Sequence, residues 1–150
     1  MFGKKLSEYI RFDLWILIFI AVVWAVRLGI SMTGTPFATT RWVSINIVLL
    51  LGLIYCSVAV HTTGFGSYKQ LYGLLLVLNV FAHVLIATGI MIGMVTGTTN
   101  AFTTPEVFGG QNGATVFHAL LHVIVSPIAA LIAWLVGSVI LFVTRKVKGA

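Results

Sequence analysis

Three of the four histidines in this 150-residue chain, His83, His118 and His122, lie inside long apolar stretches, where an imidazole needs a hydrogen-bond partner or a ligand. His118 and His122 are four residues apart and share one helix face, so they can bind one metal ion with His83 as a third ligand. They cannot be the two axial ligands of one haem, because those ligands approach the iron from opposite sides. A haem would take His83 and His122 from two facing helices, with His118 donating a hydrogen bond nearby.

The remaining reactive side chains exclude several kinds of chemistry. The three carboxylates are Glu8 and Glu106, outside the apolar stretches, and Asp13, at the edge of the first one. They supply neither a carboxylate pair for hydrolysis nor the acid of an intramembrane Ser-His-Asp triad. The single cysteine, Cys56, can form no disulfide within the chain and belongs to no Cys-x-x-Cys motif. The basic residues adjoin apolar stretches without an aromatic-interleaved stripe, so we expect no nucleic-acid partner.

Two arginines strengthen the haem hypothesis. Arg27 lies within the outer part of the first apolar stretch, and Arg41 lies at the edge of the second. Both could bind haem propionates, since a guanidinium pairs with a carboxylate through two parallel hydrogen bonds. The alternative is that Arg27 extends to the lipid headgroups and that Arg41 only begins a helix. Asn79 shares a helix face with His83 and completes the predicted cofactor site.

A second polar group flanks the short glycine-containing loop between the second and third stretches. It consists of His61, Tyr68, Lys69 and Tyr72. These residues could line a quinone head-group pocket or a proton entrance. The alternative interpretation is a hydrated loop with an aromatic belt at the membrane surface.

Membrane helices must position these side chains. Hydrophobic residues make up 59% of the chain and charged residues only 8%, too few charges to cover a soluble particle. A helix needs about 20 apolar residues to cross a hydrocarbon core of about 30 Å. Four stretches are long enough: about 12–32, 42–60, 71–96 and 114–143. They are continuous apolar runs, unlike the alternating strands of a β-barrel. The sequence therefore predicts one all-α domain, an integral membrane four-helix bundle.

The basic residues predict an orientation for this bundle. Seven of the nine Lys and Arg residues fall on the side of the two chain termini, and two fall on the other side. The positive-inside rule then places both termini in the cytoplasm, with the protein in the plasma (inner) membrane. The Thr/Gly-rich loop after the third stretch is expected outside.

Small residues and a proline predict features of the helix packing. Gly89, Gly93 and Gly97 form a row on the third stretch, which is typical of close helix packing; a hinge or a partner contact is the alternative. Pro127 removes the hydrogen bond to the carbonyl of Val123 and is expected to kink the fourth stretch. That kink is either a tolerated membrane proline or a device that makes room for a flat ligand.

With NVFAH at 79–83 and FHALLHVIVSP at 117–127, the chain resembles the small membrane-bound b-type cytochromes, which include cytochrome b561-like proteins and haem-carrying anchor subunits of respiratory dehydrogenases. The resemblance in architecture covers the whole chain. Many b561-like proteins carry a histidine on their first helix; this chain has none there, so one haem b is implied. In such families the haem passes electrons between quinol and a partner redox centre, which implies partner membrane or redox subunits here.

Three functions are consistent with these patterns. The leading hypothesis is a haem b subunit for electron transfer or anchoring in a redox complex, exchanging electrons with quinone, rather than a stand-alone enzyme. The second is a histidine-lined conductor of protons or transition-metal ions. The third is a cofactor-free membrane scaffold whose polar faces satisfy one another.

Overall fold

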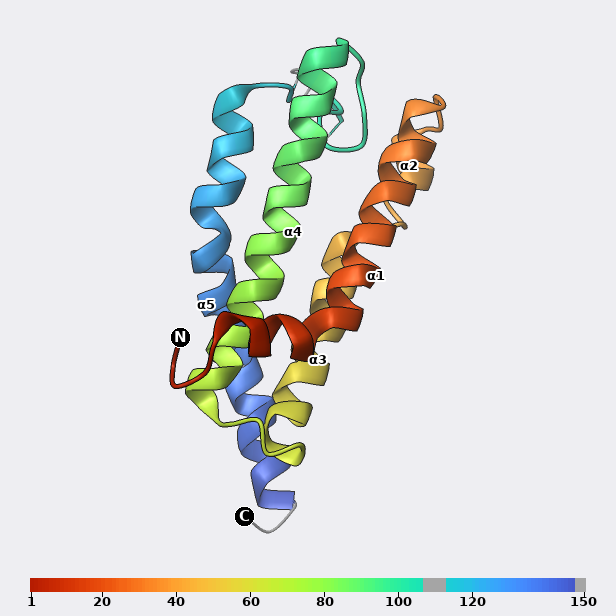
Figure 1. Ribbon diagram of the computed structural model, residues 1–150. Coiled ribbons are helices and arrows are strands. Elements are labelled where there is room, and N and C mark those ends of the chain that lie inside the picture. The colour runs from red at the N-terminus through yellow and green to blue at the C-terminus, as the bar shows by residue number, and fades with distance from the viewer. Residues whose placement is uncertain (107–112, 148–150) are drawn as a thin grey trace.

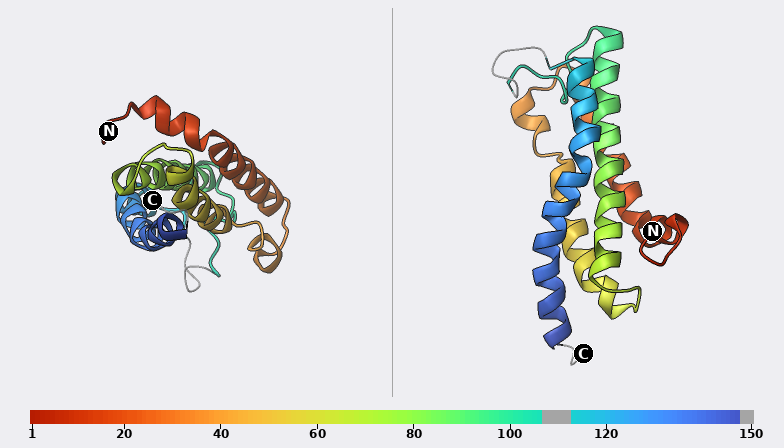
Figure 2. Two further views of the ribbon diagram at one scale, coloured as in Figure 1. Left: turned by 90° about the horizontal axis from the view of Figure 1, so that it is seen from below. Right: turned by 90° about the vertical axis from the view of Figure 1, so that its left-hand side faces the viewer.

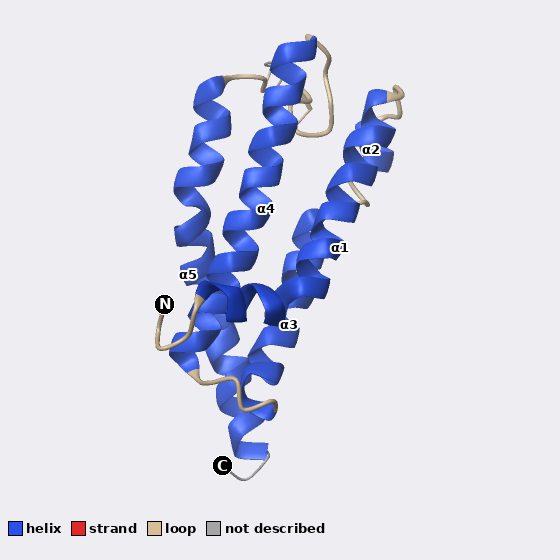
Figure 3. Cartoon of the chain, in the orientation of Figure 1, coloured by secondary structure: helices blue, strands red, loops and turns tan. Residues whose placement is uncertain are grey.

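The computed structural model describes residues 1–106 and 113–147, and in these residues the regular secondary structure is entirely helical (Figures 1 and 3). Four long helices, α1 (Leu6–Met32), α3 (Ile45–Thr62), α4 (Tyr68–Thr96) and α5 (Val116–Val147), are joined by loops, and the short α2 (Phe37–Thr40) lies between α1 and α3. The predicted all-α fold is confirmed.

Four helical segments are long and apolar enough to cross a membrane. They are Leu6–Met32, Phe37–Thr62, Tyr68–Thr96 and Val116–Val147. Large apolar side chains cover the outside of the bundle, among them Trp15, 79% exposed, and Phe117, 75% exposed. Such a surface suits contact with lipid rather than with water. The predicted four-span membrane architecture agrees with this structure, although α1 begins earlier than the hydropathy pattern predicts, at Leu6.

Helices α3 and α4 pack on each other, and α1 and α5 each pack on both of them. The most extensive interface joins α4 and α5, and α3 packs on both of them. Helix α1 packs on α3 and α4 and has no interface with α5 in the described residues, so it lies at the edge of the bundle (Figure 2). The centre is built from leucines of α4, including the fully buried Leu71, Leu74 and Leu78.

Local sequence signals set the limits of α4. Ser67 and Gln70 form a capping box, in which the Ser67 N–H donates to Gln70 Oε1 at 3.0 Å. The Gln70 side chain also donates to the carbonyl of Phe2, which ties the N-terminal segment to the start of α4. At the other end Gly97 adopts φ +65°, a left-handed conformation that stops the helix at low steric cost for glycine.

Helix α5 continues through Pro127 without losing a hydrogen-bond partner for the carbonyl of Val123. The Ser126 hydroxyl donates to this oxygen at 2.8 Å, so the proline is tolerated in an apolar span. Further along, Gly137 allows α5 to approach α3 closely. A Cβ at this position would lie 2.6 Å from Ser57 Oγ.

The small-residue row on α4 faces a loop rather than another helix. The segment 100–104, which we call the plug, folds back along α4 at the end of the bundle formed by residues 33–44, 97–106 and 113–115, the loop end (Figure 1). A Cβ on Gly89 would lie 2.4 Å from the Phe102 ring, and a Cβ on Gly93 would lie 3.0 Å from Asn100 Nδ2. The glycines therefore serve close packing, as the sequence predicts, but the element they accommodate is the plug.

Candidate functional site: a histidine chain beneath a buried loop

The structure brings together the three predicted intramembrane histidines. His118 Nε2 lies 3.1 Å from His122 Nε2, and His122 Nδ1 lies 3.3 Å from His83 Nδ1, both within hydrogen-bond distance. Because His118 and His122 come from the first turns of α5 and His83 from the middle of α4, the α4–α5 interface positions all three rings. The result is a continuous hydrogen-bonded chain of imidazoles.

One backbone carbonyl fixes where the protons lie in this chain. His118 Nδ1 is 2.7 Å from the carbonyl oxygen of Gly113, which can only accept a hydrogen bond, so this nitrogen carries the proton. In a neutral chain His118 Nε2 must then accept from His122 Nε2, and His122 Nδ1 must accept from His83 Nδ1. The remaining nitrogen, His83 Nε2, is left without a proton.

A cavity of about 200 Å³ adjoins the chain. Its lining residues are Arg27, Ile45, Asn46, Ile86, Ala101, Phe102, His118 and His122. The guanidinium of Arg27 lies 5.4 Å from the Phe102 ring centroid, and its Nε is buried with no hydrogen-bond partner. Within residues 1–106 and 113–147 the one ion pair joins Lys4 to Glu8, so no described carboxylate neutralises Arg27.

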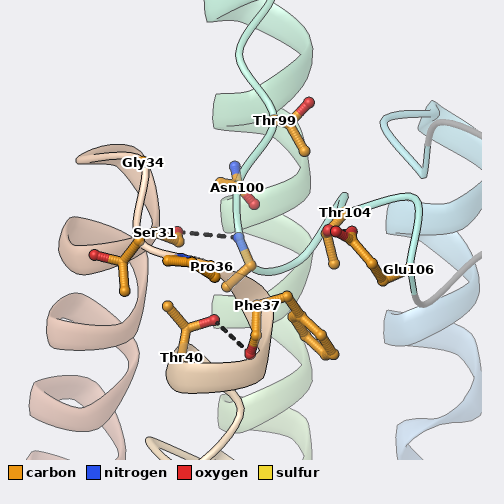
Figure 4. Close-up of a pocket in the computed structure, with 11 residues that line it drawn as sticks. Ser31, Gly34, Pro36, Phe37, Thr40, Thr99, Asn100, Thr104 and Glu106 are labelled. Carbon is orange, nitrogen blue, oxygen red and sulfur yellow. Dashed lines mark hydrogen bonds between the residues drawn. The ribbon is translucent and has the colours of Figure 1, made fainter.

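The plug separates this cavity from a polar hollow at the loop end. The plug is held by the Ala101 N–H, which donates to Ser31 Oγ at 3.0 Å (Figure 4). It is also held by Asn100 Nδ2, which donates to the carbonyl of Gly89 at 2.8 Å. The hollow, about 220 Å³, includes Thr104 and Glu106 in its lining. The Thr104 hydroxyl donates to the Glu106 carboxylate and holds the pKa of that exposed group below its ordinary value of 4.5.

The histidines and the buried polar side chains next to them form a polar column inside the bundle. This column ends one turn beyond the histidines. Asn79 and Ser126, each one turn along its helix from His83 and His122, are both buried. Their side chains donate to carbonyls of their own helices, Asn79 Nδ2 to Leu75 and Ser126 Oγ to Val123, each at 2.8 Å. The next buried positions on these faces are the apolar Leu75 and Ala130. Among the described side chains, the histidine chain therefore reaches the bundle interior from the loop end alone.

This geometry is a hydrogen-bonded chain and not a metal centre. No group of three or more His, Cys, Asp or Glu side chains in the described residues could hold a metal ion. The reason is visible at His122, which presents one ring nitrogen to His118 and the other to His83, so the three rings do not converge on one point. A haem does not fit between His83 and His122 as they stand, because their nitrogens touch; it would require the two rings to separate.

The other predicted site residues lie apart from the chain. Arg41 is exposed, and its guanidinium lies 5.2 Å from the ring centroid of Trp42. At the opposite end of the bundle, Lys69 and Tyr72 help to line an apolar hollow of about 210 Å³. The carbonyl of Tyr68 accepts a hydrogen bond from Trp134 Nε1 at 2.8 Å.

His61 lies in the last turn of α3 and is half-buried. It does not line the hollow of Lys69 and Tyr72. The structure therefore does not assemble the four predicted quinone or proton-entrance residues into one site.

Sequence reasoning missed a buried carboxylate–thiol pair. Asp13 is fully buried in the bundle, and the Cys56 thiol donates to its Oδ1 at 3.3 Å, while Oδ2 has no partner. The hydropathy pattern places Asp13 at a membrane boundary, but α1 begins seven residues before it, so the carboxylate lies well inside the helix. The sequence has one cysteine, and it has one carboxylate next to an apolar stretch. The presence of these two groups is the signal that could have predicted this contact.

The fold and the site define an all-helical protein with four membrane-length segments and an internal chain of three histidines. A comparison of the chain with protein-family models, with curated protein sequences and with solved structures finds no match.

Proposed function

We propose that this membrane protein transfers protons between the loop end of its bundle and the interior of the membrane through His83, His122 and His118. The observation that carries the proposal is the unbroken hydrogen-bonded chain, with nitrogen–nitrogen distances of 3.1 Å and 3.3 Å. Histidine is the side chain whose ordinary titration range allows it both to accept and to release a proton near neutral pH. Conduction through the whole bilayer is not part of the proposal, because the polar column stops at Asn79 and Ser126.

The relay follows from the proton positions in the neutral chain. A proton that arrives at His83 Nε2 displaces the proton on His83 Nδ1 to His122 Nδ1. His122 Nε2 then gives its proton to His118 Nε2, which leaves His118 protonated on both nitrogens. The positive charge has moved from α4 to the first turn of α5, next to the cavity, while no heavy atom has changed place. The same steps in reverse carry a proton inward only from the proton positions that an outward transfer leaves behind.

The test is the titration of the histidine rings by ¹⁵N NMR, with the purified protein in lipid nanodiscs. We expect proton uptake to change the signals of His83, His118 and His122 together, because the three rings are hydrogen-bonded in one chain. His122→Gln should break the chain in its middle and let the other two rings titrate independently. His61→Gln is the matched control and should leave the three signals unchanged. Three rings that stay neutral throughout, or a His118 titration indifferent to His122→Gln, would refute the relay.

A second proposal is the haem b subunit implied by the resemblance to b-type cytochromes, acting in electron transfer with quinone and partner redox subunits. Two observations favour it. His83 and His122 face each other from separate helices, and Arg27 Nε, next to the adjoining cavity, has no hydrogen-bond partner among the described residues. It requires the two rings to move apart. A dithionite-reduced minus oxidised spectrum should then show a b-type band that disappears in His83→Ala and His122→Ala but persists in His61→Ala. A colourless protein purified from haem-supplemented cells would exclude it.

The charge distribution supports the orientation with both termini in the cytoplasm of the plasma (inner) membrane. In a Cys56→Ser background, a cysteine at Thr99 should react with a membrane-impermeant thiol reagent in intact cells, and one at Lys69 should react only after the cells are opened. The reverse pattern would overturn this orientation.

A further inference from the structure

Arg27 of α1 lines the cavity beside the histidine chain, and it forms no ion pair within the described residues. Its Nε is buried and has no hydrogen-bond partner among these residues. Its neighbour in the cavity is the Phe102 ring, which stabilises a cation through its face but cannot accept the directed hydrogen bond that a buried guanidinium N–H requires. A charged side chain inside an apolar span calls for an anionic or aqueous partner.

The size of the cavity limits what that partner can be. Its volume of about 200 Å³ corresponds to roughly seven water molecules at about 30 Å³ each. Drug-sized ligands occupy pockets of about 300 to 1,000 Å³, so a haem or a long-chain fatty acid exceeds the space. A small anion, together with a few water molecules, fits it.

The chemistry of the lining favours a planar oxyanion. A guanidinium binds a carboxylate with two parallel hydrogen bonds, a geometry that a spherical halide cannot use. Asn46 adds an amide that can donate a further hydrogen bond, and Ile45 and Ile86 supply an apolar wall suited to a short alkyl group. All three proton-bearing nitrogens of the neutral histidine chain are already engaged, so the histidines contribute charge rather than directed bonds.

We propose that this cavity binds a short-chain monocarboxylate, of the size of formate or acetate, with the carboxylate on Arg27 and beside His118 and His122. The coupling of this binding to proton uptake rests on the proposed relay; the binding itself does not. The titratable groups that line or adjoin the cavity are Arg27 from α1, His83 from α4, and His118 and His122 from α5; α3 and the plug contribute none to the lining. An anion in the cavity and an excess proton on the chain attract each other, so each should favour the other's binding.

The test is isothermal titration of the nanodisc-embedded protein with sodium acetate in chloride buffer. We expect saturable binding to the wild type and a loss of about tenfold or more in Arg27→Gln, because a charge-assisted pair of hydrogen bonds is removed. Arg41→Gln is the matched control: it removes an arginine from the same end of the bundle, outside the cavity, and should bind acetate like the wild type. Circular dichroism of the variants checks that the helices persist.

The outcomes separate this proposal from the relay. Absence of acetate binding in the wild type, equal affinity in Arg27→Gln, or equal affinity for hexanoate would each overturn the carboxylate site. Acetate binding that is lost in Arg27→Gln and is accompanied by proton uptake supports both proposals. The same binding without proton uptake, with histidines that stay neutral in the NMR titration, supports the site and refutes the relay.

Discussion

The hydrogen bonds of Asn100 should stabilise the whole bundle, although this residue lies in a loop. Its Nδ2 donates to the Gly89 carbonyl at 2.8 Å, and its Oδ1 accepts from the Phe102 N–H at 2.9 Å, with the side chain 2% exposed. Asn100→Ala removes two buried hydrogen bonds, worth about 1 kcal/mol each, and leaves the Phe102 N–H without this acceptor, which costs about 1 kcal/mol more. We expect a loss of about 3 kcal/mol in the free energy of unfolding.

Cys56 provides the assay, because it is the only cysteine of the chain and is fully buried. When labelling requires unfolding, a loss of about 3 kcal/mol accelerates the reaction of its thiol with a small maleimide about 100-fold. Thr99→Ala, a change at the exposed neighbouring position, is the matched control and should alter stability by about 0.5 kcal/mol at most. Equal labelling rates in Asn100→Ala and Thr99→Ala would refute the argument that the plug supports the bundle.

Two further substitutions probe the packing of α3. Gly137→Ala places a methyl group 2.6 Å from Ser57 Oγ and should lower stability by about 1–3 kcal/mol in thermal unfolding. Adding Ser57→Ala to this variant should restore part of the lost stability. A Gly137→Ala variant as stable as the wild type would contradict the close approach of the helices. Cys56→Val leaves Asp13 without its hydrogen-bond donor and should destabilise the protein by about 1–3 kcal/mol, whereas Cys56→Ser keeps a donor and should remain close to the wild type. Equal thermal midpoints for these two Cys56 variants would show that the thiol does not stabilise the carboxylate.

The helices could be predicted from the sequence because their signals are local. A long apolar run is enough to indicate a span, and the 100° rotation per residue places Ser126 and Gly137 on the buried face of α5 together with His122. Gly97 ends α4 because it adopts a left-handed backbone conformation, which glycine accepts at low steric cost. These features need no knowledge of the neighbouring helices.

The plug and the cavity could not be predicted in this way because they depend on distant contacts. Nothing near Asn100 in the sequence indicates that its amide will bind the Gly89 carbonyl, or that Ser31 will receive the N–H of Ala101 from across 70 residues. The position of Arg27 Nε, which has no hydrogen-bond partner among the described residues, likewise depends on where the plug and α1 meet. Loop conformations of this kind are set by tertiary contacts, which periodicity does not report.

The hydrogen bond from His118 to the Gly113 carbonyl sets the direction in which the hydrogen bonds of the histidine chain point. After each proton transfer this arrangement must be restored. In the proposed relay, once a proton has passed from His83 to His118 and has left from Nε2, this nitrogen and His122 Nε2 would face each other at 3.1 Å with no proton between them. Two lone pairs in that position repel, so a ring must turn over before a second proton can follow the same route. Ring rotation in a packed interior requires neighbouring side chains to move, whereas the proton transfers do not. In the relay that we propose, the chain would therefore store a single proton, and the rotation of an imidazole would set the rate of reloading.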